Sequence, residues 1–158
     1  MKLRVIGLLA ALALLGACSS NGSTGASTGT GAAAATAGVT SGSQEDLVAN
    51  VGDRVFYALA SDTLSSEARA TLDRQAAWLA RYPSVSVQLA GNCDERGTEE
   101  YNLALGQRRA NAARDYLVAR GVSSARISTI SYGKERPTAL GSDEQAYAQN
   151  RNVITSVR

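Results

Sequence analysis

The residues best suited to chemistry lie in one short segment, 91–98, which contains Asp94 and Glu95, and in Arg109 further along the chain. Two adjacent carboxylates could in principle serve as the acid and the base of a glycoside hydrolase. On an extended segment, however, they would point to opposite sides, whereas that reaction needs two carboxylates that face one bond. The chain also contains no histidine, which excludes His-based triads and His-ligated zinc. We therefore expect a binding protein that is not an enzyme, with no cofactor and no metal site.

Cys18 is a second reactive residue, and it ends a pattern typical of an exported lipoprotein. Residues 1–17 begin with two basic side chains, continue as an apolar stretch and end in small residues. The stretch is shorter than the about 20 residues that a membrane-spanning helix needs. We therefore expect residues 1–17 to be a removed signal peptide and Cys18 to be lipidated, as in a bacterial lipobox; an ordinary signal peptide that happens to contain a cysteine is the alternative. Because Ser19 rather than aspartate follows, the expected destination is the outer membrane, with the rest of the chain facing the periplasm.

The charge balance argues against a nucleic-acid partner. The chain has 16 basic and 14 acidic side chains, and loss of residues 1–17 would leave 14 of each. Nucleic-acid-binding proteins normally show a basic excess or a basic stripe. The only other cysteine is Cys93, so lipidation of Cys18 leaves no partner for a disulfide within the chain.

The next part of the chain is almost wholly Ser, Gly, Thr and Ala. This composition buries too little apolar surface to order itself. As a flexible chain, such a segment would span roughly 25–30 Å. We expect a tether over 18–44, carrying the lipid on Cys18, and a single folded domain over 45–158.

Within this domain, strand-like and helix-like patterns alternate, as expected of a layered domain that contains both element types. Tyr82 and Pro83 predict the end of the first long helix, whereas Thr98 and Gly121 predict the start and the end of the second. The apolar positions of the first helix that share a face are Ala68, Leu72, Ala76 and Leu79. The expected strands are marked by Val55, Tyr57 and Leu59, by Val85, Val87 and Leu89 up to Gly91, by 127–132, and by Val153, Thr155 and Val157, with a short helix over 143–149 before the last strand.

The second helix divides into two neighbouring stripes when its residues are placed at about 100° intervals. The stripe expected to be buried consists of Leu103, Gly106, Ala110, Ala113 and Leu117. The stripe expected at its flank consists of Asn102, Leu105, Arg109 and Tyr116. Arg109 is therefore expected at the rim of the core, where it could face a groove.

Segment 91–98, followed by Asn102, Leu105, Arg109 and Ala110 and later by Asn150 and Arg151, resembles the signature of the OmpA-like peptidoglycan-binding domain. Residues 70–86 and 128–137 more specifically resemble the peptidoglycan-associated lipoproteins (Pal) of the Tol-Pal system. The resemblance covers roughly residues 50–158. It implies an α/β (α+β) fold, a two-layer sandwich in which a four-stranded mixed sheet carries helices on one face in the order βαβαβ(α)β. It also implies non-covalent binding to the cell wall, which would link the outer membrane to peptidoglycan.

The implied ligand is the stem peptide of uncrosslinked peptidoglycan containing diaminopimelate, which carries an ammonium and a carboxylate on one stereocentre. Carried over by position, Asp94 would take the ammonium and Arg109 would take the carboxylate as a planar fork. Asn102 and Leu105 would line the same groove, and Arg151 is a weaker candidate. Each has a structural alternative: a turn cap for Asp94, a solvated helix residue for Arg109, a first-turn polar residue for Asn102 and a core residue for Leu105.

The resemblance also implies TolB and other Tol proteins as partners, with TolB competing for the same face. The chain nevertheless departs from the family pattern, with Asn92 in place of a histidine, Asn152 in place of an arginine, and Ala58 and Ala60 in place of aspartates. Asparagine can keep a hydrogen bond but cannot carry charge. The alternative is therefore a diverged lipoprotein that acts as a protein-interaction scaffold with weakened wall binding.

Overall fold

The computed structural model describes residues 39–158, so the predictions for residues 1–17, for Cys18 and for most of the tether lie outside the described residues. The elements are α1 (Gln44–Asp46), η1 (Leu47–Val51), β1 (Arg54–Phe56), α2 (Ser66–Arg81), β2 (Val87–Asn92), α3 (Glu99–Ala119), η2 (Ser124–Arg126), β3 (Ile127–Gly133), α4 (Glu144–Asn150) and β4 (Asn152–Val157). None of the helices described combines the length and the apolar character needed to cross a membrane.

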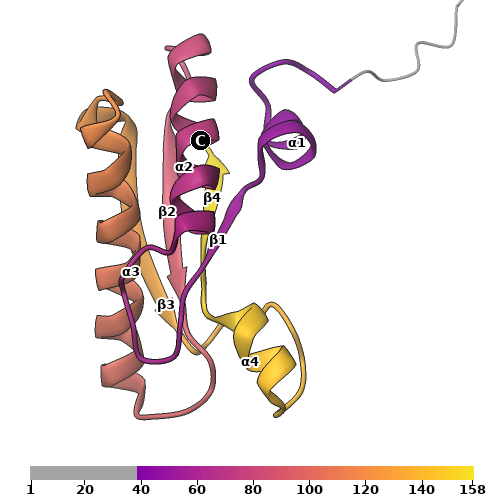
Figure 1. Ribbon diagram of the computed structural model, residues 1–158, viewed down its shortest axis with the longest axis vertical. Helices are drawn as coiled ribbons and strands as arrows, with labels where there is room; N and C mark the ends of the chain where they lie inside the picture. The colour runs from indigo at the N-terminus through magenta and orange to yellow at the C-terminus, as the bar shows by residue number, and fades with distance from the viewer. Residues whose placement is uncertain (1–38) are drawn as a thin grey trace, which may run out of the picture. The chain divides into compact units, whose positions relative to one another are not determined.

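The four strands form one mixed sheet in the order β1-β4-β2-β3, with the long helices α2 and α3 beside it (Figure 1). β2 and β3 are parallel, whereas β4 is antiparallel to both of its neighbours. The last strand of the chain therefore lies in the interior of the sheet between β1 and β2. This architecture confirms the expected mixed α/β sandwich.

α2 forms where the apolar periodicity predicts it. The Ser65 side chain accepts a hydrogen bond from the Ala68 N–H and so caps the start of the helix. The helix ends at Arg81, one residue before Tyr82 and two before Pro83, which cannot continue it. The predicted buried face is confirmed, because Ala68, Leu72, Ala76 and Leu79 are all buried.

α3 begins and ends as predicted, and its buried face extends beyond the predicted apolar stripe into the polar flank. Thr98 caps its start, and Gly121 has the positive φ of 93° that favours glycine after a helix. Leu103, expected in the core, is 51% exposed, whereas Asn102, Leu105 and Arg109 are buried. The other four residues of the predicted stripe are buried: Gly106, Ala110, Ala113 and Leu117. Asn102 and Arg109 join them because both polar side chains find hydrogen-bond partners inside the protein, which lowers the cost of burying them.

Two glycines allow α3 to lie close against β2. A Cβ atom on Gly91 would overlap the carbonyl oxygen of Gly106, so neither position has room for a side chain. Direct contact between helix and strand backbones at this point fixes the distance of α3 from the sheet.

The first strand is shorter than predicted. It ends at Phe56, which pairs with Asn152, the first residue of β4, so no further partner is available on that strand. Leu59, expected as an inward strand residue, is 58% exposed. The second strand also shifts slightly, since Val85 precedes β2 and Asn92 ends it. Helices α1 and η1 were not anticipated from periodicity, because together they span only Gln44–Val51.

Candidate functional site

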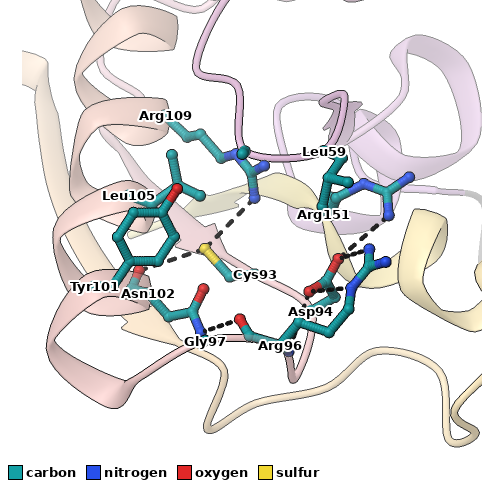
Figure 2. A pocket seen from close by; sticks show the side chains of 11 residues that line it. Leu59, Cys93, Asp94, Arg96, Gly97, Tyr101, Asn102, Leu105, Arg109 and Arg151 are labelled. Carbon is teal, nitrogen blue, oxygen red and sulfur yellow. Dashed lines mark hydrogen bonds and ion pairs between the residues drawn. The ribbon is translucent and has the colours of Figure 1, made fainter.

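All five predicted site residues line one pocket of about 210 Å³ (Figure 2). Asp94 follows β2, Asn102, Leu105 and Arg109 lie on α3, and Arg151 immediately precedes β4. The end of β2, the start of α3 and the start of β4 lie together at the end of the sheet away from α1 (Figure 1).

Asp94 is buried and is held by two arginines (Figure 2). Its Oδ2 atom lies 2.6 Å from Arg96 and 3.2 Å from Arg151, and its Oδ1 atom accepts hydrogen bonds from the Arg96 backbone N–H and Nε. Burial alone would raise the pKa of Asp94, but hydrogen bonds from Arg96 and Arg151 outweigh it and hold this pKa below its ordinary value. The carboxylate is therefore ionised at neutral pH, and its roughly four lone-pair positions are occupied.

Arg109 lies inside the protein and not at the rim of the core, since it is 0% exposed. Its guanidinium donates to the backbone carbonyls of Ser61 at 2.8 Å, Asn92 at 3.0 Å and Ala58 at 3.0 Å. A further contact of 3.4 Å joins it to the Cys93 sulfur. Burial lowers the pKa of Arg109, yet an arginine remains charged at every physiological pH.

These contacts change the expected chemistry of Arg109. Four of its five N–H groups are already used, so the planar fork expected for a carboxylate is not free. No carboxylate forms an ion pair with Arg109 among residues 39–158. The positive charge is consequently buried next to the pocket with neutral partners only.

Asn102 and Leu105 shape the inner part of the pocket. The Asn102 side chain donates to the Arg96 carbonyl at 2.8 Å, which fixes the turn that carries Asp94. Its backbone carbonyl lies 3.3 Å from the Cys93 sulfur, and burial raises the pKa of that thiol. Leu105 is 3% exposed and supplies an apolar surface.

Arg151 joins the pocket to two other segments. It donates to the Tyr57 carbonyl at 3.2 Å and pairs with Glu144 of α4 at 2.8 Å, in addition to its bond with Asp94. Arg151 is the weaker candidate in the sequence because the hydrophobic periodicity does not show that residue 151 lies beside residue 94.

Six further lining residues were not among the predicted site residues: Leu59, Ala60, Cys93, Arg96, Gly97 and Tyr101. Arg96 lies over the Tyr147 ring at 4.3 Å, and its side chain is 38% exposed. Leu59 and Tyr101 are exposed apolar side chains on the pocket wall. Of these, only Arg96 has a signal in the sequence, because a turn brings residue i+2 back to Asp94.

Of the four departures from the family pattern, only Ala60 lines the pocket. Ala60 has a φ of 53°, the only positive φ of a non-glycine residue in the described part of the chain. Ala58 contributes its carbonyl to Arg109. Asn92 and Asn152 are hydrogen-bonded to each other at 2.8 Å, and the Oδ1 atom of Asn92 is buried without a partner within residues 39–158.

The arrangement is suited to binding an anion or a zwitterion. Arg96, Arg109 and Arg151 outnumber Asp94, the single carboxylate of the lining. Glu95 turns to the other side of the loop, where it accepts a hydrogen bond of 2.7 Å from the Tyr147 hydroxyl, so the two adjacent carboxylates do not face a common bond. No group of three potential metal ligands occurs in the described range.

A family model described as the OmpA family matches residues 56–151. The chain is 50% identical over 151 residues to a peptidoglycan-associated lipoprotein of Rhizobium meliloti, covering 96% of this chain and 85% of that protein. It is 42% identical over 156 residues to the protein of the same name from Haemophilus influenzae, covering 97% of this chain and 94% of the other.

Solved structures agree with these similarities. The crystal structure of the peptidoglycan-associated lipoprotein from Burkholderia pseudomallei has a TM-score of 0.65 at 42% identity and covers 67% of this chain and 90% of that one. The C-terminal domain of Helicobacter pylori MotB has a TM-score of 0.63 at 22% identity, covers 67% of this chain and 84% of its own, and indicates a shared fold. The chain therefore belongs to the OmpA family and, within it, to the peptidoglycan-associated lipoproteins.

Proposed function

We propose that this chain is an outer-membrane lipoprotein that holds peptidoglycan non-covalently through the pocket around Asp94 and Arg109. The observation that carries the proposal is the buried guanidinium of Arg109, which has no carboxylate partner among the described residues. A buried charge without a counter-ion is costly, so a ligand carboxylate that reaches it gains more than it would from an exposed arginine. The peptidoglycan-associated lipoproteins to which the chain is similar support the choice of ligand.

The proposed ligand group is the diaminopimelate of an uncrosslinked stem peptide. Its ammonium would replace Arg96 on Asp94, since Arg96 is the more exposed of the two arginines held there. Its carboxylate would take the remaining N–H of Arg109 and the released Arg96 side chain. Leu59 and Tyr101 would contact the methylene chain of the ligand.

The proposed attachment has three parts in series: lipid on Cys18 in the outer membrane, the tether, and the folded domain in the periplasm. The segments that form the pocket lie at the end of the sheet away from α1 (Figure 1), which favours presentation of the pocket toward the wall. TolB is the proposed competitor for the pocket, as the resemblance to Pal implies, and other Tol proteins are proposed partners.

The direct test is co-sedimentation of the unlipidated mature chain with purified sacculi, followed by calorimetry with a diaminopimelate stem peptide and a lysine-containing control. Asp94→Asn is expected to weaken binding by about 30-fold or more, because it leaves the ligand ammonium without a charged partner. Glu95→Gln is the matched control, since this neighbouring carboxylate faces away from the pocket. Equal binding of both stem peptides, or no sedimentation of the wild-type chain, would favour the protein-interaction scaffold instead.

A further inference from the structure

The segment that joins the tether to the domain is fastened to the end of β4. The Gln44 side chain in α1 accepts a hydrogen bond from the Val157 N–H at 2.7 Å and donates one to the Thr155 carbonyl at 3.3 Å. β1 pairs with β4 only from Asn152 to Ile154. The Gln44 amide therefore continues the pairing of β4 beyond Ile154, the partner of the first residue of β1.

A second attachment joins the same segment to α2. The buried Asp46 carboxylate accepts hydrogen bonds from the Trp78 indole N–H at 2.9 Å, the Gly42 N–H at 2.8 Å and the Asn50 amide at 2.7 Å. The Trp78 ring packs edge-on against Tyr82 at 5.2 Å between centroids. Through Asp46, these bonds hold the segment that contains α1 against α2.

β4 connects this attachment with the pocket. The strand runs from Asn152, which directly follows Arg151, to Val157, which Gln44 holds. Arg151 is bonded in turn to Asp94. The two ends of one interior strand thus contact the tether side and the pocket side of the domain.

We propose that Gln44 is a tension clamp, through which a pull arriving along the N-terminal chain enters β4 and is carried along that strand to Arg151 at the pocket. The inference rests on the proposed function in one respect: the outer membrane pulls on the N-terminal chain and the wall pulls on the pocket. A further function follows from it: the domain transmits tension in addition to binding a ligand.

The physical reason is the direction of the hydrogen bonds. In antiparallel pairs these bonds lie perpendicular to the strands. A pull along β4 therefore shears all of its hydrogen bonds to β1 and β2 at the same time. Without Gln44, the same pull would act on the bond between Asp46 and Trp78 and then on β1, which is paired over only three residues, Arg54–Phe56, and neither path leads directly into β4. The lifetime of the folded domain under tension should therefore depend on this one side chain.

The test is the lifetime of the unlipidated mature chain at constant force, pulled between the Cys18 thiol and Leu140→Cys. Leu140 is 91% exposed and precedes α4, whereas Cys93 is 3% exposed and does not compete for thiol handles. Gln44→Ala removes two hydrogen bonds and should shorten the lifetime about tenfold, equivalent to about 1.4 kcal/mol. Gln44→Glu keeps the acceptor for Val157 and should shorten it about threefold. Gln145→Ala, which truncates an exposed glutamine of α4, should leave it unchanged.

A second pulling direction separates a clamp from a general contribution to stability. With handles at Ser124→Cys and Leu140→Cys and with Cys18→Ser, the pull bypasses α1, so Gln44→Ala should change the lifetime less than about twofold. An equal loss in both directions, or no loss in the first, would overturn the proposal. Should Gln44→Ala not fold, the same comparison is made with Gln44→Glu. No peptidoglycan is present in this assay, so its outcome is independent of whether the chain binds the wall.

Discussion

Arg109 should be essential for the stability of the folded domain as well as for ligand binding. This differs from the expectation that Arg109 lies at the rim of the core. Arg109→Ala would leave the carbonyls of Ala58, Ser61 and Asn92 without their donors. A buried acceptor left unpaired costs about 1–3 kcal/mol. Water entering from the pocket would partly hydrate the Ala58 and Ser61 carbonyls, so the lower figure applies to each. The expected loss is at least about 3 kcal/mol, a large fraction of the about 5–15 kcal/mol typical of a folded domain.

Urea unfolding followed by circular dichroism measures this loss. With a slope of about 2 kcal/mol per molar urea, the midpoint should fall by about 1.5 M. Arg109→Lys should recover less than half of the difference, because one ammonium cannot reach three separate carbonyls as the guanidinium does. A reduced midpoint would also mean that loss of binding by Arg109 variants needs correction for the unfolded fraction.

The matched control is the preceding residue on the same helix. Arg108 pairs with Asp62 at 3.4 Å, with both side chains about half exposed at 51% and 44%. An exposed ion pair of this kind contributes less than about 1 kcal/mol. Arg108→Ala should therefore shift the midpoint by no more than about 0.5 M. If Arg109→Ala unfolds at the same urea concentration as Arg108→Ala, the structural role assigned to Arg109 is wrong.

Gly91→Ala should lower the unfolding temperature by at least about 10 °C in calorimetry, because the added Cβ forces α3 away from β2 at Gly106; an unchanged temperature would mean that the helix moves at no cost. Hydrogen bonds from Gly42, Trp78 and Asn50 lower the pKa of Asp46, and the pKa of Asp94 is lowered as well. Both carboxylates therefore stabilise the folded state above the unfolded pKa of about 4. This contribution is lost as the pH falls through their folded pKa values. Because the chain has no histidine, its stability in urea should be nearly flat from about pH 5 to 8 and should fall below about pH 4, less steeply in Asp46→Asn; a step near pH 6 would contradict this.

The sequence predicts best where one force dominates. The face of α2 follows from apolar spacing, and the ends of α3 follow from Thr98 and Gly121, because these depend on neighbours along the chain. The sheet order is a different matter, since β4 lies between β1 and β2 and no periodicity reports which strands become neighbours. The resemblance to a known family implied a four-stranded mixed sheet but not the order of its strands.

The prediction for α3 missed part of the buried face because hydropathy treats Asn102 and Arg109 as residues that avoid the core. The burial of Asn102 depends on the nearby Arg96 carbonyl, and the burial of Arg109 depends on carbonyls of the loop after β1, which lies far away in the sequence. α1 escaped detection for a related reason. Its three residues, Gln44–Asp46, are stabilised by Trp78 and by β4, and so by contacts that a local pattern does not contain.

The positions that depart from the family pattern divide into two groups with different consequences. Asn92 and Asn152 bond to each other and do not line the pocket; with Ala58, Asn92 acts on it through a backbone carbonyl that accepts a hydrogen bond from Arg109. Ala60 lines the pocket, and it stands where an aspartate would add a second carboxylate to Asp94. Without that carboxylate, the three arginines of the lining are opposed by Asp94 and by Glu144, which pairs with Arg151 and Arg96, so one positive charge remains in excess. The ligand carboxylate should therefore contribute more to affinity in this chain than the ligand ammonium does, because attraction grows with the excess of opposite charge that lines the site.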